Sequence, residues 1–399
     1  MAEDQPTIVI FLPNFELGGA ERQAYELTSR LDSRKYRLTL IALRGEGNLA
    51  EFFRSIPDLS VITLEIKNPL STLIQLSSLL AERKVQVIHS FLDSTHFYSL
   101  LLRAIRWRLK LILSIRDSRE DRAFGYTTLR SRAKERLLEL FLKHSRFLAS
   151  MQISNSEAGR RMFGGKRASK ITVIPNGIDC EKFKPDFSAR ERIRNAINVP
   201  SETPLVGILA NCTAYKDYPT FIRAAQIVLR DLKDVHFLSI GENRTKVGDF
   251  ARSLVEVSGV KDRFHFLGRR CDVERLLPGL DLLCSSSVTE GFSNAICEGM
   301  SCGVPCIVTD VGDSRIIVGD TGLVVRPGHP EEFATAITCI LRLSARDSRE
   351  LGMKARQRIV ANYEVSQMVA QYERIYESLI QSSNVAANHS DCETWGNIP

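Results

Sequence analysis

Short runs of consecutive apolar residues alternate with amphipathic helical stretches along the whole chain. Such runs are typical of strands buried on both faces, and the helical stretches between them are typical of crossover connections. Strands are predicted at residues 7–11, 37–42, 85–90, 109–115, 152–154, 171–174, 205–210, 236–240, 264–267, 280–285 and 304–308. The main helices are predicted at 21–31, 70–83, 96–106, 219–229, 246–257, 273–277, 294–301, 330–343, 347–362 and about 366–381. This order predicts the α/β class, with parallel sheets covered by helices on both faces.

The alternation pauses once, near the middle of the chain. Residues 174–179 (IPNGID) end the first series, a polar stretch follows, and a second α/β series starts at Pro204. A polar break of this kind is typical of a domain boundary. We therefore predict two doubly wound domains of similar size, residues 1–180 and 181–363. The last helix, at about 364–381, is expected to complete the first domain, and residues 382–399 are expected to form a frayed polar tail.

Composition restricts the class of protein further. Among the 399 residues, 44% are hydrophobic and 25% are charged, values that are ordinary for a globular protein. No run of about 18 apolar residues appears, and the start MAEDQPTIVI carries acids where a signal peptide carries bases. The nine cysteines include no CxxC pair. We therefore expect a cytoplasmic protein with reduced thiols and no metal site.

The net charge of +7 is concentrated in one region. Between Arg103 and Lys170, basic residues far outnumber acidic ones. A local positive surface attracts phosphate groups, whether on nucleic acid, lipid headgroups or a diphosphate-carrying substrate. The alternative is an ordinary solvated helix face, and charge alone does not decide between the two.

Residues 285–309 (SSSVTEGFSNAICEGMSCGVPCIVT) carry the sharpest local signal. A strand ends near Ser285, a loop follows, and Ser293 or Asn294 can cap the next helix. Ligands of open α/β sheets bind where a strand's carboxyl end leads into a helix. The free N–H groups of Ser293, Asn294 and Ala295, together with the helix dipole, suit an anion there.

Two carboxylates flank this predicted anion site. Glu298 lies four residues after Asn294, on the same side of the helix, and Glu290 lies in the loop before it. Carboxylates repel phosphate but accept hydrogen bonds from the hydroxyl groups of a ribose and a sugar. The structural alternative is that Glu298 faces solvent and Glu290 only caps the loop.

Four segments together resemble a known family. Glu290 and Glu298 have the EX7E spacing of retaining glycosyltransferases of family 4, which have the GT-B fold, and the resemblance is to members that build bacterial polysaccharides. Residues 17–22 (LGGAER) resemble the family's first glycine loop, residues 173–179 (VIPNGID) its interdomain connector, and residues 216–219 (KDYP) its lysine segment. The resemblance covers residues 7 to about 380. It implies two Rossmann-like, doubly wound parallel-sheet domains that face each other across a cleft.

The resemblance also implies a role for each matching residue. Lys216 would neutralise the donor diphosphate, which lowers the cost of charge on the leaving group. The amides of Asn294 and Ala295, beside Ser293, would hold that diphosphate, and Glu298 would bind the ribose. The remaining implied donor contacts are Glu290 with Gly291 and Phe292 at the sugar, Gly268 and Arg269 at the nucleobase, and Gly18 and Gly19 at the diphosphate from across the cleft.

Two departures from the family pattern concern the same site. Asn211 stands where the family usually has an arginine that clamps the diphosphate. Arg116 stands where many members have a histidine close to the sugar. His89 and His96 remain as candidates for that histidine; we favour His96 as a catalytic residue, because it lies where acceptor and donor sugar would meet.

The resemblance therefore predicts a retaining, metal-independent glycosyltransferase. It would move a sugar from a nucleotide-diphosphate donor, expected to be a UDP-sugar, to a hydroxyl group of a lipid-linked oligosaccharide. The nucleotide-sugar is a co-substrate, so no cofactor is expected, and neither is nucleic acid. The basic stretch suggests peripheral contact with an anionic membrane at its inner face. The alternatives are a catalytically weakened nucleotide-sugar-binding subunit and a GT-B nucleotide-sugar epimerase.

Overall fold

The chain folds into two compact units, each built on its own parallel sheet. The computed structural model describes residues 5–16, 18–45, 47–66, 68–116 and 129–392. The first unit runs to Gly177 and resumes at Ser366, and the second spans Ile178–Val365. The expectation of two doubly wound parallel-sheet domains is confirmed.

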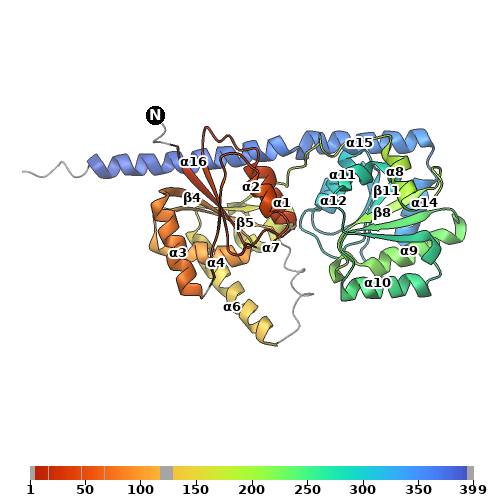
Figure 1. Cartoon of the computed structure of the whole chain (residues 1–399), viewed down its shortest axis with the longest axis horizontal. Coiled ribbons are helices and arrows are strands. Elements are labelled where there is room, and N and C mark those ends of the chain that lie inside the picture. Colours follow the sequence, from red (N-terminus) through yellow and green to blue (C-terminus); the bar gives the residue numbers. More distant parts are fainter. Residues whose placement is uncertain (1–4, 17, 46, 67, 117–128, 393–399) are drawn as a thin grey trace, which may run out of the picture. The chain divides into compact units, whose positions relative to one another are not determined.

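The first unit has a seven-stranded sheet with the order β3-β2-β1-β4-β5-β6-β7. The strands are β1 (Thr7–Leu12), β2 (Arg37–Ala42), β3 (Ser60–Thr63), β4 (Val85–Phe91), β5 (Lys110–Ile115), β6 (Met151–Ser154) and β7 (Ile171–Val173). The helices are α1 (Gly19–Thr28), α2 (Ala50–Arg54), α3 (Pro69–Glu82), α4 (Asp93–Ile105), α6 (Leu129–Ser145), α7 (Glu157–Gly164) and α16 (Val365–Cys392). Because the strand order reverses between β1 and β4, right-handed crossovers put α1 and α2 on one face and α3, α4 and α6 on the other. Figure 1 shows α3, α4 and α6 below this sheet and α16 above it.

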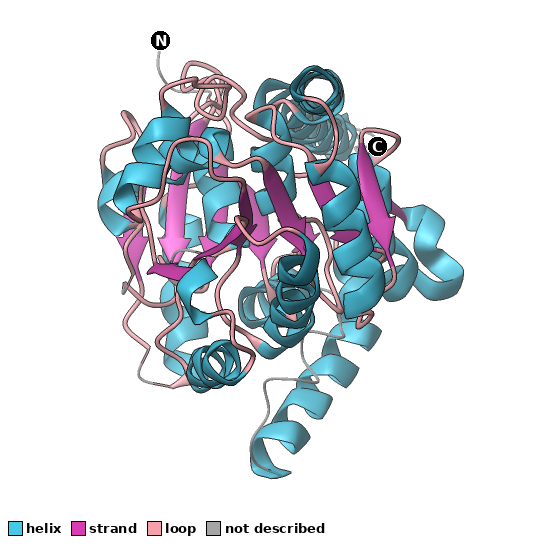
Figure 2. Cartoon of the chain, turned by 90° about the vertical axis from the view of Figure 1, so that its right-hand side faces the viewer, coloured by secondary structure: helices cyan, strands magenta, loops and turns pink. Residues whose placement is uncertain are grey.

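The second unit has a six-stranded sheet with the order β10-β9-β8-β11-β12-β13. Its strands are β8 (Leu205–Leu209), β9 (His236–Ile240), β10 (Phe264–Gly268), β11 (Leu282–Ser285), β12 (Cys306–Thr309) and β13 (Gly322–Val325). Its helices are α8 (Ala189–Ala196), α9 (Tyr218–Asp231), α10 (Lys246–Val257), α11 (Val273–Leu276), α12 (Asn294–Ser301), α13 (Ser314–Val318), α14 (Pro330–Leu341) and α15 (Ala345–Tyr363). Alternate strand residues enter two separate cores, one packed under α12 and α15 and one under α9 and α14. Figure 2 shows the strands as a middle layer between helices.

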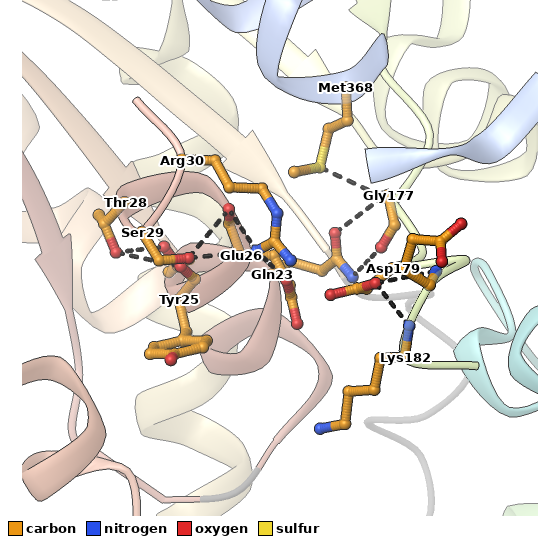
Figure 3. Close-up of polar contacts among 12 residues, drawn as sticks. Gln23, Tyr25, Glu26, Thr28, Ser29, Arg30, Gly177, Asp179, Lys182 and Met368 are labelled. Carbon is orange, nitrogen blue, oxygen red and sulfur yellow. Dashed lines mark hydrogen bonds and ion pairs between the residues drawn. The ribbon is translucent and has the colours of Figure 1, made fainter. Parts of the chain in front are cut away.

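The two passages of the chain between the units lie side by side. Ile178 N donates to Tyr363 O at 2.8 Å, and Val365 N donates to Ile178 O at 3.0 Å. On the other side of this junction, Gln23 of α1 holds Gly177 through two hydrogen bonds of 2.9 Å, one donated and one accepted (Figure 3). The crossing therefore falls between Gly177 and Ile178, three residues before the boundary expected from the sequence.

The expected end of the last helix is wrong. The last helix, α16, continues to Cys392 instead of ending near Gln381. The segment from residue 382 to 392 contains neither glycine nor proline, so nothing in its backbone chemistry ends a helix. The rest of the expected tail, residues 393–399, lies outside the described residues, as do Leu17 and the part of the basic stretch at 117–128.

Candidate functional site

The candidate site lies at the carboxyl edge of the second sheet, where the strand order reverses between β8 and β11. Lys216 ends a short 3₁₀ turn that follows β8. The next residue, Asp217, has a left-handed backbone (φ 44°, ψ 55°), which aspartate tolerates better than most residues. The Asp217 carboxylate caps α9 by accepting a hydrogen bond from Thr220 N at 3.3 Å, and it accepts a second one from Thr220 Oγ1 at 2.6 Å. This sharp turn fixes the direction in which the Lys216 side chain leaves the backbone.

The loop after β11 is bound to the main chain of the Lys216 segment by two hydrogen bonds. Val288 N donates to Tyr215 O at 2.8 Å, and Ser286 Oγ donates to Lys216 O at 2.8 Å. These bonds bring together two segments separated by about seventy residues in the chain. These hydrogen bonds therefore hold the loop that carries Glu290 in place at the carboxyl edge of the sheet.

Lys216 and Glu290 form an ion pair between Nζ and Oε1. Ser287 Oγ donates a second hydrogen bond to the same Oε1 atom, at 2.8 Å. The side chains of Lys216 and Glu290 are only 20% and 10% exposed, so the pair is shielded from solvent more than an ordinary surface pair. Within the described part of the chain, both hydrogen bonds to this carboxylate go to Oε1 and leave Oε2 able to accept one from a hydroxyl group.

A glycine on the next loop permits this arrangement. Gly312 has a positive φ of 56°, and a Cβ atom there would lie 2.2 Å from Glu290 O. Asp313 N donates to Gly291 O at 3.1 Å. The loop that follows β12 therefore holds the Glu290 loop at a distance that only glycine allows.

The helix α12 begins directly after this loop. Ser293 precedes it in an extended conformation and makes no side-chain cap hydrogen bond. Phe292 is nearly buried and packs against Tyr363, with ring centroids 5.5 Å apart. Asn294 and Ala295 are partly exposed, whereas the residues that follow in the helix are buried. The start of α12 is thus the accessible end of an otherwise buried helix.

Glu298 lies one turn into α12 and is only 2% exposed. The alternative in which this carboxylate faces solvent is therefore wrong. A buried carboxylate needs compensating hydrogen bonds, which is consistent with a side chain that binds a specific polar group. Whether that group is a ribose remains a prediction.

The other predicted residues of the second unit follow the neighbouring strand ends. Asn211, after β8, accepts a hydrogen bond from Glu242 N at 2.9 Å through its Oδ1 atom. Gly241 N, after β9, donates to Gly268 O at the end of β10, also at 2.9 Å. Gly268 has a positive φ of 67°, and Arg269 after it is exposed. Asn211 therefore joins two strand ends through its carbonyl oxygen, a role that the sequence does not suggest.

In the first unit, the strand order reverses between β1 and β4. Gly18 and Gly19 follow β1, and a Cβ atom at Gly18 would lie 2.3 Å from Glu21 Oε2, so the carboxylate of Glu21 folds back over this glycine. His96 lies in the first turn of α4 and is 4% exposed, with Nε2 3.2 Å from Ser90 O and Nδ1 3.4 Å from Asp93 Oδ1. The structure places these residues at the carboxyl edge of their own sheet.

His89 has a structural role instead. Its ring is fully buried, with Nδ1 2.7 Å from the Tyr376 hydroxyl of α16 and Nε2 2.7 Å from Ser114 Oγ of β5. Burial, helped by the charge of Arg116, holds the pKa of His89 well below its usual range. Both ring nitrogens are therefore engaged inside the core, and of the two histidines His96 is the better candidate for catalysis.

Arg116, which stands in place of the expected histidine, is held by three partners. It donates to Asn176 Oδ1 at 2.6 Å and to the Tyr372 hydroxyl at 2.9 Å, and its guanidinium lies 4.9 Å from the centre of the Phe91 ring. These contacts join β5, the segment after β7 and α16. Arg116 therefore stabilises the first unit next to its junction with the second.

The cysteines near α12 behave as small buried residues. Burial raises the pKa of the Cys297, Cys302 and Cys306 thiols, which makes them poor metal ligands and nucleophiles. Across residues 5–116 and 129–392, apart from the three single gaps, no group of three or more His, Cys, Asp or Glu side chains could hold a metal ion. Over the same described ranges, no helix combines the length and apolar character needed to cross a bilayer.

Sequence reasoning missed the residues that hold the site in place. These are Ser286, Ser287, Gly312 and Asn211 acting through its carbonyl. The serine run at 285–287 was a usable signal, because hydroxyl groups at a strand's carboxyl end commonly orient neighbouring groups. The contact between Gly312 and Glu290 depends on tertiary structure, so sequence spacing does not reveal it.

Comparisons with known proteins find family matches on both units. Residues 17–182 match the family model described as Glycosyltransferase Family 4, and residues 203–342 match the one described as Glycosyl transferases group 1. The chain is 22% identical over 91% of its length to the UDP-Gal:alpha-D-GlcNAc-diphosphoundecaprenol alpha-1,3-galactosyltransferase of Escherichia coli, of which 95% is covered. It is 23% identical over 90% of its length to the putative glycosyltransferase EpsF of Bacillus subtilis, of which 96% is covered.

Solved structures show the same fold. The Alr3699/HepE protein of Anabaena in complex with UDP matches with a TM-score of 0.78 and 21% identity, over 93% of this chain and 100% of that one. A glycosyltransferase from Rickettsia africae matches with a TM-score of 0.79 and 18% identity, over 94% of this chain and 99% of that one.

The two parallel-sheet units with these matches define a glycosyltransferase of the GT-B fold. The two family models cover most of the chain, one on each unit. The chain belongs to the glycosyltransferases of group 1, family 4, and is a nucleotide-sugar-dependent enzyme of the retaining type.

Proposed function

We propose that this enzyme transfers a hexose from a UDP-sugar to a hydroxyl group of a lipid-linked oligosaccharide. The choice of UDP is supported by the Anabaena protein, which was solved with UDP and with UDP-glucose. The choice of acceptor is supported by the E. coli relative, whose name specifies a diphosphoundecaprenol-linked sugar.

The observation that carries the proposal is the Lys216–Glu290 pair beside the start of α12. The diphosphate lies against the amides of Asn294 and Ala295, with Ser293 at the cap, and Lys216 Nζ compensates its charge. The helix dipole adds about 0.3–1 kcal/mol to anion binding, and more where the end is partly buried. A cation and a helix terminus together replace the metal ion that other transferases use at the leaving group.

The two carboxylates determine where the rest of the donor lies. Glu298 accepts hydrogen bonds from the ribose, and Glu290, with the amides of Gly291 and Phe292, holds the hexose. The nucleobase lies at the β10 end beside Gly268 and Arg269, with Asn211 at the neighbouring strand end. Gly18, Gly19 and His96 lie at the carboxyl edge of the first sheet, and their roles at the diphosphate and at the sugar stay predictions.

The reaction proceeds with retention on one face of the sugar. The bond between the anomeric carbon and the phosphate oxygen breaks, and the acceptor oxygen bonds to the same carbon from the same side. The acceptor proton passes to the departing phosphate oxygen, so UDP leaves without a separate base. Lys216 stabilises the negative charge that develops on that oxygen. Removal of the Lys216 side chain should therefore slow the breaking of the sugar–phosphate bond more than any other step.

The test is UDP release from a panel of UDP-sugars, with and without a lipid-linked acceptor. Lys216→Ala and Glu290→Ala are each expected to lower kcat/KM at least 100-fold, because each removes an interaction that strengthens in the transition state. Lys261→Ala is the matched control, since Lys261 is an exposed lysine outside the site. Donor binding without release would favour a binding subunit, and release of an epimerised sugar without an acceptor would favour an epimerase.

A further inference from the structure

The helix α15 ends at a tertiary contact. Residues 345–392 contain no proline, and their single glycine lies well before the break, so the sequence would allow α15 and α16 to form one helix. Glu364 between them is extended instead (φ −61°, ψ 139°), where Ile178 pairs with it as in a parallel sheet. Tyr363 O accepts a hydrogen bond from Ile178 N. The position of Tyr363 is therefore set where the chain crosses between the units.

The ring of Tyr363 packs against the loop that carries Glu290. Tyr363 and Phe292 are each 9% exposed, and their ring centroids lie 5.5 Å apart with an angle of 65° between the ring planes. Aromatic pairs favour this edge-to-face geometry. Both rings belong to one core cluster, which also contains Cys297 and Ile317. Phe292 is therefore anchored through its side chain, and its main-chain amide, which we assign to the hexose, cannot move far without that side chain.

The rest of α15 is held against the helices that follow the site loops. Arg356 donates to Ser301 O in the last turn of α12, and Arg358 donates from Nε to Ile317 O of α13 at 2.8 Å. An arginine at the carboxyl end of a helix satisfies carbonyl groups that the helix itself leaves unpaired. Figure 1 shows α15 beside α12 in the second unit. Because α15 is fixed in this way, the Tyr363 ring has little freedom to follow the loop if the loop shifts.

Each residue of the loop 290–292 has its own contact. The Glu290 carboxylate is held by the ion pair and the serine hydrogen bond described above. Gly291 O accepts a hydrogen bond of 3.1 Å from the loop after β12. Phe292 is held by the ring of Tyr363. Removal of this last contact should therefore loosen the predicted sugar site and leave the predicted diphosphate site in place.

We propose that Tyr363 is a positioning residue for the donor sugar, because its ring fixes the main chain at Phe292. This rests on and deepens the proposed function, which assigns the hexose to the amides of Gly291 and Phe292. The alternative is that Tyr363 only fills the core, in which case its removal lowers stability without changing how the donor is bound. A shift of about 1 Å in a group that orients a substrate can lower the rate by up to about 100-fold, so the two alternatives differ measurably.

The first test compares donor turnover with UDP affinity. Tyr363→Leu should lower kcat/KM for the UDP-sugar at least about tenfold, whereas the Kd of UDP from calorimetry should change by less than about twofold. Tyr363→Phe keeps the ring and should match the wild type in both measurements. Phe333→Leu is the matched control, because Phe333 is a fully buried aromatic residue in the other core of the second unit.

Three results would overturn the proposal. They are an unchanged kcat/KM in Tyr363→Leu, a loss of UDP affinity as large as the loss of kcat/KM, and the same kinetic loss in Phe333→Leu. If Tyr363→Leu does not fold, Phe292→Leu removes the same ring contact from the other side and should show the same difference between turnover and UDP affinity. Where both variants fold, the double variant should lose no more than either single variant, because the two substitutions remove one contact.

Hydrogen exchange of the ligand-free enzyme tests the position of the loop directly. The amides of residues 290–295 should exchange roughly tenfold faster in Tyr363→Leu than in the wild type, and at the wild-type rate in Tyr363→Phe. The amides of residues 214–216 should keep their wild-type rates in both variants. Unchanged exchange at 290–295 in Tyr363→Leu would overturn the proposal, since the ring would then not hold the loop.

The two proposals can fail separately. The exchange measurement needs no substrate, whereas the proposed function requires UDP release. Faster exchange in Tyr363→Leu, from an enzyme that releases no UDP from any UDP-sugar, would refute the proposed function alone. UDP release with the same kinetics and the same exchange rates in all variants would refute the role of Tyr363 alone.

Discussion

Two residues of the site orient the carboxylate of Glu290 through one of its oxygen atoms. Lys216 and Ser287 both contact Glu290 Oε1, and Ser287 is 1% exposed. A hydroxyl group that is buried beside an ion pair has one orientation, so it fixes the rotation of the carboxylate. Ser287 is therefore a positioning residue for Glu290.

Ser287→Ala should lower kcat/KM about tenfold, because a hydrogen bond to a charged group is worth about 1.5–3 kcal/mol. Ser287→Thr keeps the hydroxyl group and should restore most of the loss. Steady-state kinetics of UDP release measures both. Equal activity of Ser287→Ala and the wild type would show that Lys216 alone orients Glu290.

A histidine pair away from the site makes a separate prediction about acid stability. His236 Nδ1 lies 2.8 Å from His265 Nε2, and Arg263 lies 2.7 Å from the other ring nitrogen of His236. Burial and these neighbours lower the pKa of His236 to about 4. Because the unfolded chain binds the proton more readily, the free energy of unfolding should fall as the pH drops from about 6.5 towards 4.

At pH 5 this loss should amount to about 1 kcal/mol or more relative to pH 7.5. Urea unfolding at both pH values measures it. His236→Gln removes the titrating group and should show a smaller difference between the two pH values. A difference as large as that of the wild type would assign the acid sensitivity to other groups.

At the scale of elements, the sequence predicted long, regular segments best. The strand Arg37–Ala42 and the helices Lys246–Val257 and Asn294–Ser301 have the predicted boundaries. The short strands β3 and β13 were missed. The site residues on α12 and its loop were predicted from spacing, but the contacts that orient them come from loops distant in the chain.

The contact between Gly312 and Glu290 leads to a prediction about the loop that carries Glu290. Gly312→Ala should destabilise the enzyme and displace the Glu290 loop, because the new Cβ atom would meet Glu290 O. Gly328→Ala is the matched control: Gly328 has a positive φ of 72°, but its Cβ atom would meet nothing within 4 Å. We expect about 1 kcal/mol of destabilisation for the control and clearly more for Gly312→Ala.

Urea unfolding and UDP release should be measured on both glycine variants. We expect Gly312→Ala to lose activity under conditions where it is still folded, and Gly328→Ala to retain activity. If the two variants match in stability and activity, the loop after β12 does not determine where Glu290 lies.

At the scale of the whole molecule, each unit has its predicted site residues at a carboxyl edge where the strand order reverses. In the second unit these are Lys216, Glu290 and the start of α12, and in the first they are Gly18, Gly19 and His96. The alternation of strands and helices predicted this architecture, because parallel sheets follow from it. It could not predict the buried role of His89 or the partners of Arg116, since both depend on how α16 packs on the first sheet.

The central claim is that Lys216 and the start of α12 bind the diphosphate of the donor. Calorimetric titration with UDP and with uridine isolates the contribution of the diphosphate as the ratio of the two Kd values. We expect Lys216→Ala to lower this ratio at least tenfold and Lys261→Ala to leave it unchanged. An unaltered ratio in Lys216→Ala would contradict the claim and place the diphosphate elsewhere.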